Sequence, residues 1–326
     1  MDAGLSAFTS ANAELLTAIK NGVMFYVLLP LRIGLDQAVL PFTWGFVWTS
    51  GMSMALFAVG AAVGLYCAYR GKLTLGLVIL IAAGMLETGI SQLPWPFVLV
   101  GVGALSYVAG GVRLSALTVV LLSTILLSGL WERALLSLYL SGAAVFACAV
   151  LGGAIGLASA VSPMVWRVVR PVCDMLQTIP LFVFLIPVLM VFQIGEFSAF
   201  LAIIAYAIVP MIRYTRHGLT ETPAEMIEAA TASGATRWQM MRDVRAPYAA
   251  PTILLGLNQT ILYAFAMLVI AALIGTTGLG QSIYLALGQA DVGLGISAGA
   301  AMAILALIAD RIVQGFAEER RRALGL

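Results

Sequence analysis

Few side chains in this sequence have the types and spacing that catalysis or metal binding requires. The chain holds one histidine, His217, and three cysteines, Cys67, Cys148 and Cys173, which lie scattered through or beside apolar segments. Their spacing matches neither a metal site nor a disulfide framework, so we interpret the cysteines as small packing residues. The apolar segments hold no paired carboxylates and no nucleophile beside a base, which argues against a membrane-embedded enzyme. The sequence also lacks a G-x-x-x-x-G-K-[ST] phosphate loop, so it does not bind ATP in that manner.

Polar side chains inside otherwise apolar segments are the first candidates for a functional site. They are Gln177, Thr178, Asn258, Gln259 and Thr260, and Pro180 interrupts the backbone beside the first two. An unsatisfied amide in apolar surroundings costs about a kcal/mol or more, so these groups are expected to face protein or a water-filled path. We interpret them, with Pro180, as candidates for lining the route of a small solute. Interhelical hydrogen bonds that hold a bundle together are the alternative for each.

A long polar interruption, from Thr222 to Pro251, separates apolar segments in the second half of the chain. Thr222 and Glu225 have the spacing of a capping box for a short helix, with Pro223 at the first helical position. Gly234 is predicted to end this helix, because glycine readily adopts the left-handed conformation of a C-terminal cap. The interruption therefore begins with a helix of fixed length.

A second short helix is predicted directly after the first. Thr236 and Gln239 repeat the capping-box spacing, and Pro247 is expected to end the helix because proline lacks a backbone N–H. On the first helix, Met226 shares one face with the residues three and four positions later. This small apolar stripe is edged by charge and requires a partner.

Composition places these features in a membrane. The chain has 326 residues, of which 62% are apolar and 10% charged, and its mean hydropathy is +1.03. These values predict an all-α polytopic membrane protein. The net charge of +2 gives no reason to expect nucleic acid or an acidic partner.

About nine apolar segments are long enough, or nearly so, to span a bilayer. They run near Trp44 to Tyr69, Leu73 to Leu93, Trp95 to Ala109, Leu114 to Leu130, Leu135 to Ala160, Val172 to Phe192, Phe197 to Tyr214, Thr252 to Ile274 and Gly293 to Ile312. Residues 1–43 hold only one short apolar run, Gly22 to Leu31, which we interpret as an interfacial amphipathic segment; an uncleaved signal-like element is the lesser alternative.

The basic residues fall on alternate connections between these segments, which are therefore expected to face the cytoplasm. They are Arg70, Lys72, Arg113, Arg167, Arg170, Arg213, Arg216, His217, Arg237, Arg242, Arg245, Arg311, Arg320, Arg321 and Arg322. Nine spans then place the N-terminus outside and the C-terminus inside, with the polar interruption on the cytoplasmic side. We further expect a local ion pair between Asp310 and Arg311, a tight outer loop at Gly275 to Gly280, and a solvated cytoplasmic tail at 316–326.

The polar interruption resembles a known motif. Its residues are Glu228, Ala229 and Ala230, then Gly234 after three residues, Val244 after nine more, and Ala246 and Pro247 after one more. This pattern is similar to the EAA motif of ABC importer permeases, E-A-A-x3-G-x9-I-x-L-P. Val244 stands in place of the isoleucine and Ala246 in place of the leucine, and the second change removes apolar volume near the end of the loop.

Other segments resemble one branch of that family. Pro171 to Pro180 with Leu185 to Pro187, and Pro251 to Thr260 with Ile274 to Gln281, are similar to signatures of the glycine betaine/proline (quaternary amine) permeases. The resemblance covers roughly Pro94 to Gln314. It implies a type I ABC importer transmembrane domain of seven spans over 94–315, containing the cytoplasmic EAA loop at 215–251, and leaves 44–93 as an added pair of spans.

The resemblance also implies a function and its partners. A permease homodimer in the inner membrane would associate with two cytoplasmic ABC ATPases, which hold ATP and Mg²⁺, and with an external substrate-binding protein. The ATPase-coupling residues would be Glu228, Ala229, Ala230, Gly234, Val244 and Pro247, and this chain would need no cofactor of its own. The implied solute is betaine-like: glycine betaine, choline, proline, carnitine or trimethylamine N-oxide.

The alternative is an ion-coupled secondary transporter or channel that works without an ATPase. Such a protein requires buried ionisable relay residues. The candidates, Glu87 and Asp174, lie near the ends of predicted spans.

Overall fold

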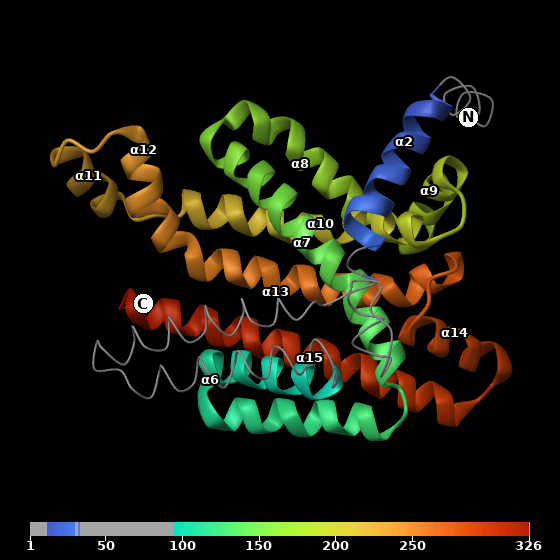
Figure 1. The fold of residues 1–326 in the computed structure, drawn as a ribbon. Helices are drawn as coiled ribbons and strands as arrows, with labels where there is room; N and C mark the ends of the chain where they lie inside the picture. The colour runs from blue at the N-terminus through green and yellow to red at the C-terminus, as the bar shows by residue number, and fades with distance from the viewer. Residues whose placement is uncertain (1–11, 30–31, 33–93, 326) are drawn as a thin grey trace, which may run out of the picture.

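A computed structural model describes residues 12–29, 32 and 94–325 of the chain, and this part contains helices and short connections but no β-strand. The predicted spans at 44–69 and 73–93 lie outside the described residues. The elements are α2 (Ala13–Val23), the π-helix η1 (Met24–Leu28), α6 (Pro94–Leu127), α7 (Trp131–Val161), α8 (Pro163–Thr178), the 3-10 helix η2 (Leu181–Phe184), α9 (Leu185–Phe192), α10 (Glu196–Thr220), α11 (Ala224–Ala232), α12 (Arg237–Gln239), the π-helix η3 (Met240–Arg245), α13 (Ala246–Ala271), the 3-10 helix η4 (Ala272–Ile274), α14 (Leu279–Gln289) and α15 (Val292–Ala323), arranged as in Figure 1.

Five described helices are long and apolar enough to cross a membrane. They cover Val98–Leu127, Trp131–Val161, Glu196–Thr220, Arg237–Ile274 and Val292–Ala323. A sixth candidate is the pair formed by α8 and the segment 181–192, which is bent by 107° at a short break. The sequence predicts seven spans for the same part of the chain, and the two counts differ because α6, which contains a kink, counts here as one helix.

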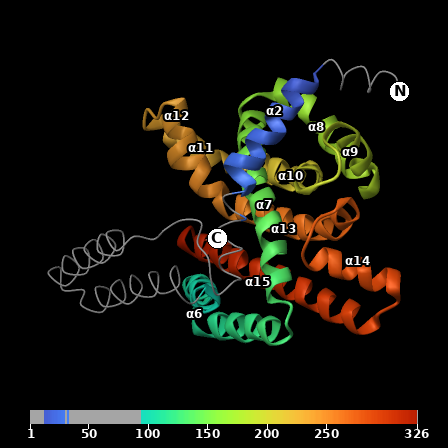
Figure 2. The same ribbon diagram turned by 45° about the vertical axis from the view of Figure 1, so that its right-hand side comes forward.

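The α6 segment is a helical hairpin whose two arms correspond to the predicted segments 95–109 and 114–130. Its backbone leaves the helical conformation at Gly110 and Gly111, where φ of the latter is +74°. The Ser115 hydroxyl donates a hydrogen bond to the Gly103 carbonyl across the turn at 2.9 Å, and the two arms lie side by side (Figure 2). The arms 94–109 and 112–127 hold 16 residues each, or about 24 Å of helix, which is shorter than the roughly 30 Å hydrocarbon core.

Three helices, α7, α10 and α13, form the centre of the bundle and approach one another closely. A Cβ added at Gly256 of α13 would lie 2.5 Å from the Cβ of Tyr214 on α10. One added at Gly156 of α7 would lie 2.8 Å from the Ile212 carbonyl oxygen of α10. Small residues at such contacts permit the backbone-to-backbone packing typical of membrane helices. The α10 helix therefore has a largely buried surface.

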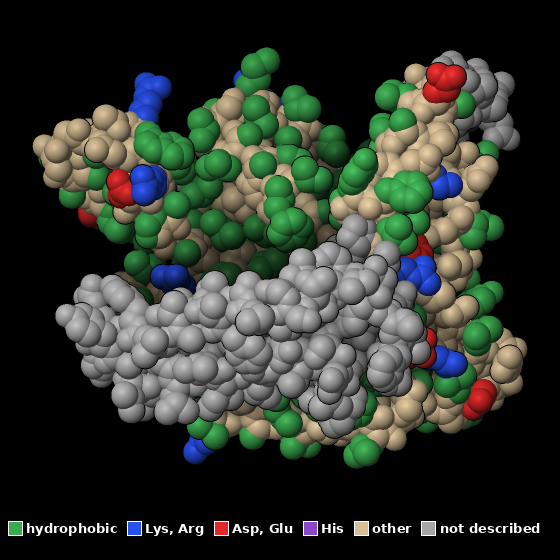
Figure 3. Space-filling view, in the orientation of Figure 1, with side chains coloured by type: hydrophobic (Ala, Val, Ile, Leu, Met, Phe, Trp, Pro, Cys, Tyr) green, Lys and Arg blue, Asp and Glu red, His purple; other side chains and the backbone are tan. Residues whose placement is uncertain are grey.

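The two ends of the bundle are formed by different elements. The α11–α12 loop and the C-terminus lie at one end, whereas α9 and α14 lie at the other (Figure 1). Hydrophobic side chains cover much of the described surface between the ends (Figure 3). The N-terminal helix α2 contacts α9 through a hydrogen bond from Lys20 Nζ to the Phe192 carbonyl at 3.1 Å, and Arg32 pairs with Glu196. The side of the membrane that each end faces stays a prediction from the basic residues.

The segment after the predicted outer loop contains a helix that the sequence analysis does not assign. Gly275 and Gly278 have φ values of +87° and +108° and make the expected tight turn. The chain then forms α14, whose first N–H group, that of Leu279, donates to the Ser137 hydroxyl of α7 at 2.8 Å. Its apolar residues pack against α15 and α13, so tertiary contacts stabilise a helix of only 11 residues.

Candidate functional site

The loop that contains the EAA-like residues is a helical hairpin that projects from one end of the bundle. It comprises α11, α12 and η3 between the long helices α10 and α13 (Figure 1). None of these three elements contains a buried residue. The loop therefore holds its shape through local hydrogen bonds and presents most of its surface outward.

The start of the first loop helix differs from the prediction. Thr222 does not cap α11: its hydroxyl donates to the Leu219 carbonyl at 3.5 Å, and its side chain is buried at the end of α10. Pro223 occupies the N-cap position instead of the first helical position. The physical reason is that the threonine hydroxyl satisfies an orphan carbonyl of the preceding helix. Glu225 still lies in the first turn of α11, where a carboxylate interacts favourably with the helix dipole.

The end of the first loop helix confirms the prediction for Gly234. Its φ is +77°, its N–H donates to the Thr231 carbonyl, and the Ala235 N–H donates to the Ala230 carbonyl, both at 3.0 Å. These two bonds form a Schellman motif. A Cβ at Gly234 would meet no atom within 4 Å, so the backbone conformation, not crowding, favours glycine here.

The second loop helix begins as predicted and ends differently. The Thr236 hydroxyl accepts from the Gln239 N–H at 3.3 Å, and the Gln239 side-chain oxygen accepts from the Thr236 N–H at 2.9 Å, which completes the capping box. Pro247 does not end the helix, because η3 leads directly into α13. A π-turn widens the helix just before the proline, and this accommodates a ring that would otherwise clash with the preceding turn.

The EAA-like residues lie on the projecting hairpin, except Pro247, which lies in the first turn of α13. Glu228, Ala229, Gly234 and Pro247 are exposed, whereas Ala230 and Val244 are half-buried. Within the described residues the Glu228 carboxylate has no ion pair and no side-chain hydrogen bond. Two apolar side chains add to this surface: Met226 is 40% exposed and Trp238 is 68% exposed. The sequence places Trp238 in the second helix but gives no sign that its indole faces outward.

The polar residues at the end of α8 lie on an exposed surface. Gln177, Thr178 and Pro180 are exposed, and the Thr178 hydroxyl donates to the Met175 carbonyl of its own helix at 3.1 Å. The helix stops at Thr178 and resumes in η2 at Leu181, so backbone groups are freed at this break. Within a bilayer, irregular backbone of this kind requires protein or water beside it.

The polar residues on α13 have different surroundings. Asn258 is 4% exposed, and its Nδ2 donates to Asp310 Oδ1 of α15 at 2.6 Å. Thr260 is fully buried and donates to the Gly256 carbonyl of its own helix at 2.9 Å, while Gln259 is half-buried. Asn258 thus makes an interhelical hydrogen bond, which was the alternative to lining a solute path.

The Asp310 carboxylate is held by amides and not by its sequence neighbour. It accepts from Asn258 and from Gln314 Nε2, the latter at 2.7 Å, whereas the predicted ion pair with Arg311 is not formed. The reason is geometric, because consecutive residues on a helix point about 100° apart, while a residue four positions later lies on the same face.

A cluster that the sequence analysis missed attaches α8 to α10. Asp174 of α8 pairs with Arg213 of α10, and also with Arg170 at 3.9 Å. The guanidinium of Arg216 lies 4.2 Å from the centre of the Trp166 ring. The sequence shows two arginines, Arg213 and Arg216, close together in a predicted cytoplasmic connection. Their partners on α8 are identified only by the structure, in which α8 folds back along α10.

Comparisons with known proteins agree with this architecture. Residues 149–322 match the family described as "Binding-protein-dependent transport system inner membrane component". Over 229 residues the chain is 37% identical to the glycine betaine/proline betaine transport system permease protein ProW of Escherichia coli strain K12, covering 70% of this chain and 65% of that protein. It is 37% identical over 236 residues to the trimethylamine N-oxide transport system permease protein TmoV of Pelagibacter ubique, covering 72% and 33%.

Two further comparisons bear on the family and the fold. Over 193 residues the chain is 39% identical to the glycine betaine transport system permease protein OpuAB of Bacillus subtilis, covering 59% of this chain and 68% of that protein. A solved inward-facing structure of the MetNI methionine ABC transporter aligns with 60% of this chain and 95% of its own, with a TM-score of 0.50 and 22% identity. The chain spans less than two thirds of the length of ProW and about a third of TmoV.

Proposed function

Because this chain belongs to the family of binding-protein-dependent transport system inner membrane components, we propose that it is the permease subunit of an ATP-driven importer. The observation that carries the proposal is the projecting hairpin of α11 and α12, with its Schellman turn at Gly234 and its capping box at Thr236. A rigid, outward-facing hairpin with exposed Met226 on its first helix suits a contact with another protein. That partner is a cytoplasmic ABC ATPase, which supplies ATP and Mg²⁺.

The solute is a small quaternary or tertiary amine. Glycine betaine, choline and carnitine are quaternary ammonium compounds, trimethylamine N-oxide is a tertiary amine oxide, and proline is a related zwitterion with a secondary amine. The relatives named for glycine betaine and trimethylamine N-oxide support this class. An external binding protein delivers the solute and provides most of the selectivity. The permease contributes a path that opens alternately to each side.

The path is formed where two copies of this chain meet along α8. The edge of α8 carries exposed Gln177 and Thr178 and the ion pair of Asp174 with Arg213. Polar groups and a broken backbone are costly against lipid, so this surface favours protein or water as its neighbour. A second copy of the chain meets both requirements, with water and solute between the two.

The proposal is tested by uptake into proteoliposomes that contain the full chain, its partner ATPase and the binding protein. We expect uptake of radiolabelled glycine betaine only with ATP, and a loss of uptake and ATPase binding in Glu228→Gln. The matched control is Glu225→Gln, which removes an equal charge from the same exposed helix. Uptake by the chain alone under an ion gradient would instead identify a secondary transporter.

A further inference from the structure

A groove lies between the end of α7 and the second part of the projecting loop. Its volume is about 530 Å³, and its walls include Leu157 and Val161 of α7, Trp238 of α12 and Met241 of η3. Ala160 and Met240 add to the apolar wall, and Arg237 and Arg245 are the charged residues of the lining, which contains no acidic residue. The groove therefore combines an apolar wall with two positive charges.

The charge of this groove is not balanced by neighbouring side chains. Arg245 Nε is buried without a hydrogen-bond partner among the described residues. The nearest arginine–carboxylate pair in the sequence, Arg242 with Asp243 at 3.9 Å, lies outside the lining. A buried guanidinium nitrogen without an acceptor is costly, so the groove favours an anionic group that accepts from Arg245.

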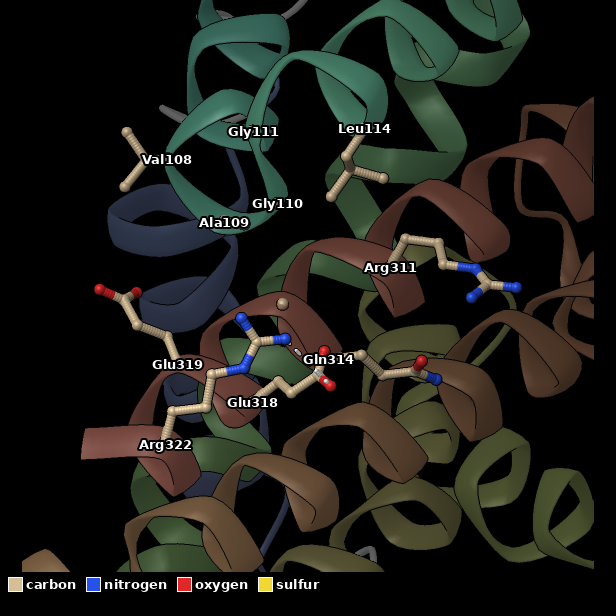
Figure 4. A pocket seen from close by; sticks show the side chains of 11 residues that line it. Val108, Ala109, Gly110, Gly111, Leu114, Arg311, Gln314, Glu318, Glu319 and Arg322 are labelled. Carbon is tan, nitrogen blue, oxygen red and sulfur yellow. Dashed lines mark ion pairs between the residues drawn. The ribbon is translucent and has the colours of Figure 1, made fainter. Parts of the chain in front are cut away.

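A second cavity at the same end of the bundle shows the contrasting case. It lies between the turn of α6 and the end of α15, with a volume of about 460 Å³. Its arginines are accompanied by Glu318 and Glu319, and Arg322 pairs with Glu318 at 3.4 Å (Figure 4). Because charges of both signs line this cavity, it has no preference for an anion.

The apolar wall of the α7 groove lies at the end of a helix long and apolar enough to cross a membrane. Val161 is the last residue of α7 and is 65% exposed, and the Trp238 indole across the groove is 68% exposed. Tryptophan beside basic residues at the end of a membrane span is typical of the lipid headgroup region. Basic grooves between spans on the cytoplasmic side bind anionic headgroups.

We propose that this groove binds one anionic phospholipid of the cytoplasmic leaflet. The phosphate accepts hydrogen bonds from Arg237 and Arg245, and an acyl chain lies against Leu157 and Val161. The bound lipid thereby connects the end of α7 to the segment that joins the loop to α13. This inference goes beyond the proposed import function, since it involves neither the solute nor the EAA-like residues.

The test measures lipid binding to the purified full chain by native mass spectrometry in detergent. Phosphatidylglycerol and phosphatidylcholine are titrated separately against the wild type and Arg237→Gln/Arg245→Gln. We expect the wild type to bind phosphatidylglycerol more tightly than phosphatidylcholine. The double variant is expected to bind phosphatidylglycerol about 25-fold more weakly than the wild type, or about fivefold for each arginine. The matched control, Arg242→Gln, removes a charge from the same π-helix outside the lining and keeps wild-type affinity.

A second measurement does not depend on the folding of an arginine variant. Phosphatidylglycerol with brominated acyl chains is expected to quench tryptophan fluorescence in the wild type more than in Trp238→Phe. Equal quenching, equal binding of the two lipids, or wild-type affinity in the double variant would each overturn the proposal. Two competition results would also overturn it. If inorganic phosphate displaced the lipid more than chloride does at equal ionic strength, the groove would be a simple anion site. If the partner ATPase displaced the lipid, the groove would be part of the ATPase contact.

Discussion

Gly234 provides a sharp test of the idea that the projecting loop works through a fixed backbone bend. Its φ is +77°, and a Cβ at this position would meet no atom of this chain within 4 Å. An alanine therefore costs only the left-handed conformation, about 1–2 kcal/mol, which lowers the ratio of the bent loop to its other conformations by roughly 5- to 30-fold. Asparagine tolerates this conformation better than alanine, and valine tolerates it worst. We expect ATPase affinity and solute uptake to decrease in the order Gly, Asn, Ala, Val.

The same series separates the backbone from the partner's surface. Binding of the purified ATPase to each variant in nanodiscs gives the affinity, and uptake into proteoliposomes gives the coupled activity. If the partner's groove merely lacked room at this position, the order would follow side-chain size, with Ala better than Asn. That order, or equal affinity for all four variants, would refute the role given to the left-handed bend.

Three other substitutions test contacts that position the loop and the bundle. Thr236→Ala removes one half of a capping box and is expected to destabilise α12 by about 1 kcal/mol, seen as faster hydrogen exchange over 237–240; Thr236→Ser is expected to retain protection. Gly256→Ala introduces a Cβ 2.5 Å from a side-chain carbon of α10 and is expected to cost about 1–3 kcal/mol in thermal unfolding, whereas Gly299→Ala, with no atom within 4 Å, is expected to be neutral. Asn258→Leu leaves Asp310 with one donor fewer, so a loss of about 1–3 kcal/mol is expected; unchanged unfolding would show that the amide adds nothing.

Local sequence signals predicted the structure correctly where the backbone conformation depends on a single residue or on a pair of nearby residues. The left-handed turn at Gly234 and the capping box at Thr236 depend on bonds spanning only a few residues, and both were predicted correctly. Thr222 has the same spacing signature as Thr236, yet its hydroxyl bonds back to Leu219 because α10 ends immediately before it. Capping spacing alone does not indicate which of two adjacent helices uses a hydroxyl.

The spans were predictable from hydrophobicity, and their three-dimensional relations were not. The break at 110–113 was placed correctly, but nothing in the composition shows that α6 folds back on itself there. Likewise, Asp174 and Arg213 are 39 positions apart, and only the packing of α8 on α10 brings them together. The helix α14 was missed because its 11 residues are stabilised by contacts with α7, α13 and α15 and carry no strong pattern of their own.

The failure of the prediction at Pro247 changes how the loop is expected to act. A helix ended by proline would place a flexible joint between the loop and the bundle, and such a joint absorbs a displacement. Instead, helical structure runs from Arg237 to Ile274 without interruption, and Asn258 lies 21 positions along it, roughly 30 Å at the rise of an α-helix. Asn258 is bonded to Asp310 of α15. A movement imposed on α12 by an ATPase would therefore reach the middle of the bundle, and through it α15, along a continuous helical backbone that changes direction between α12 and α13 (Figure 1).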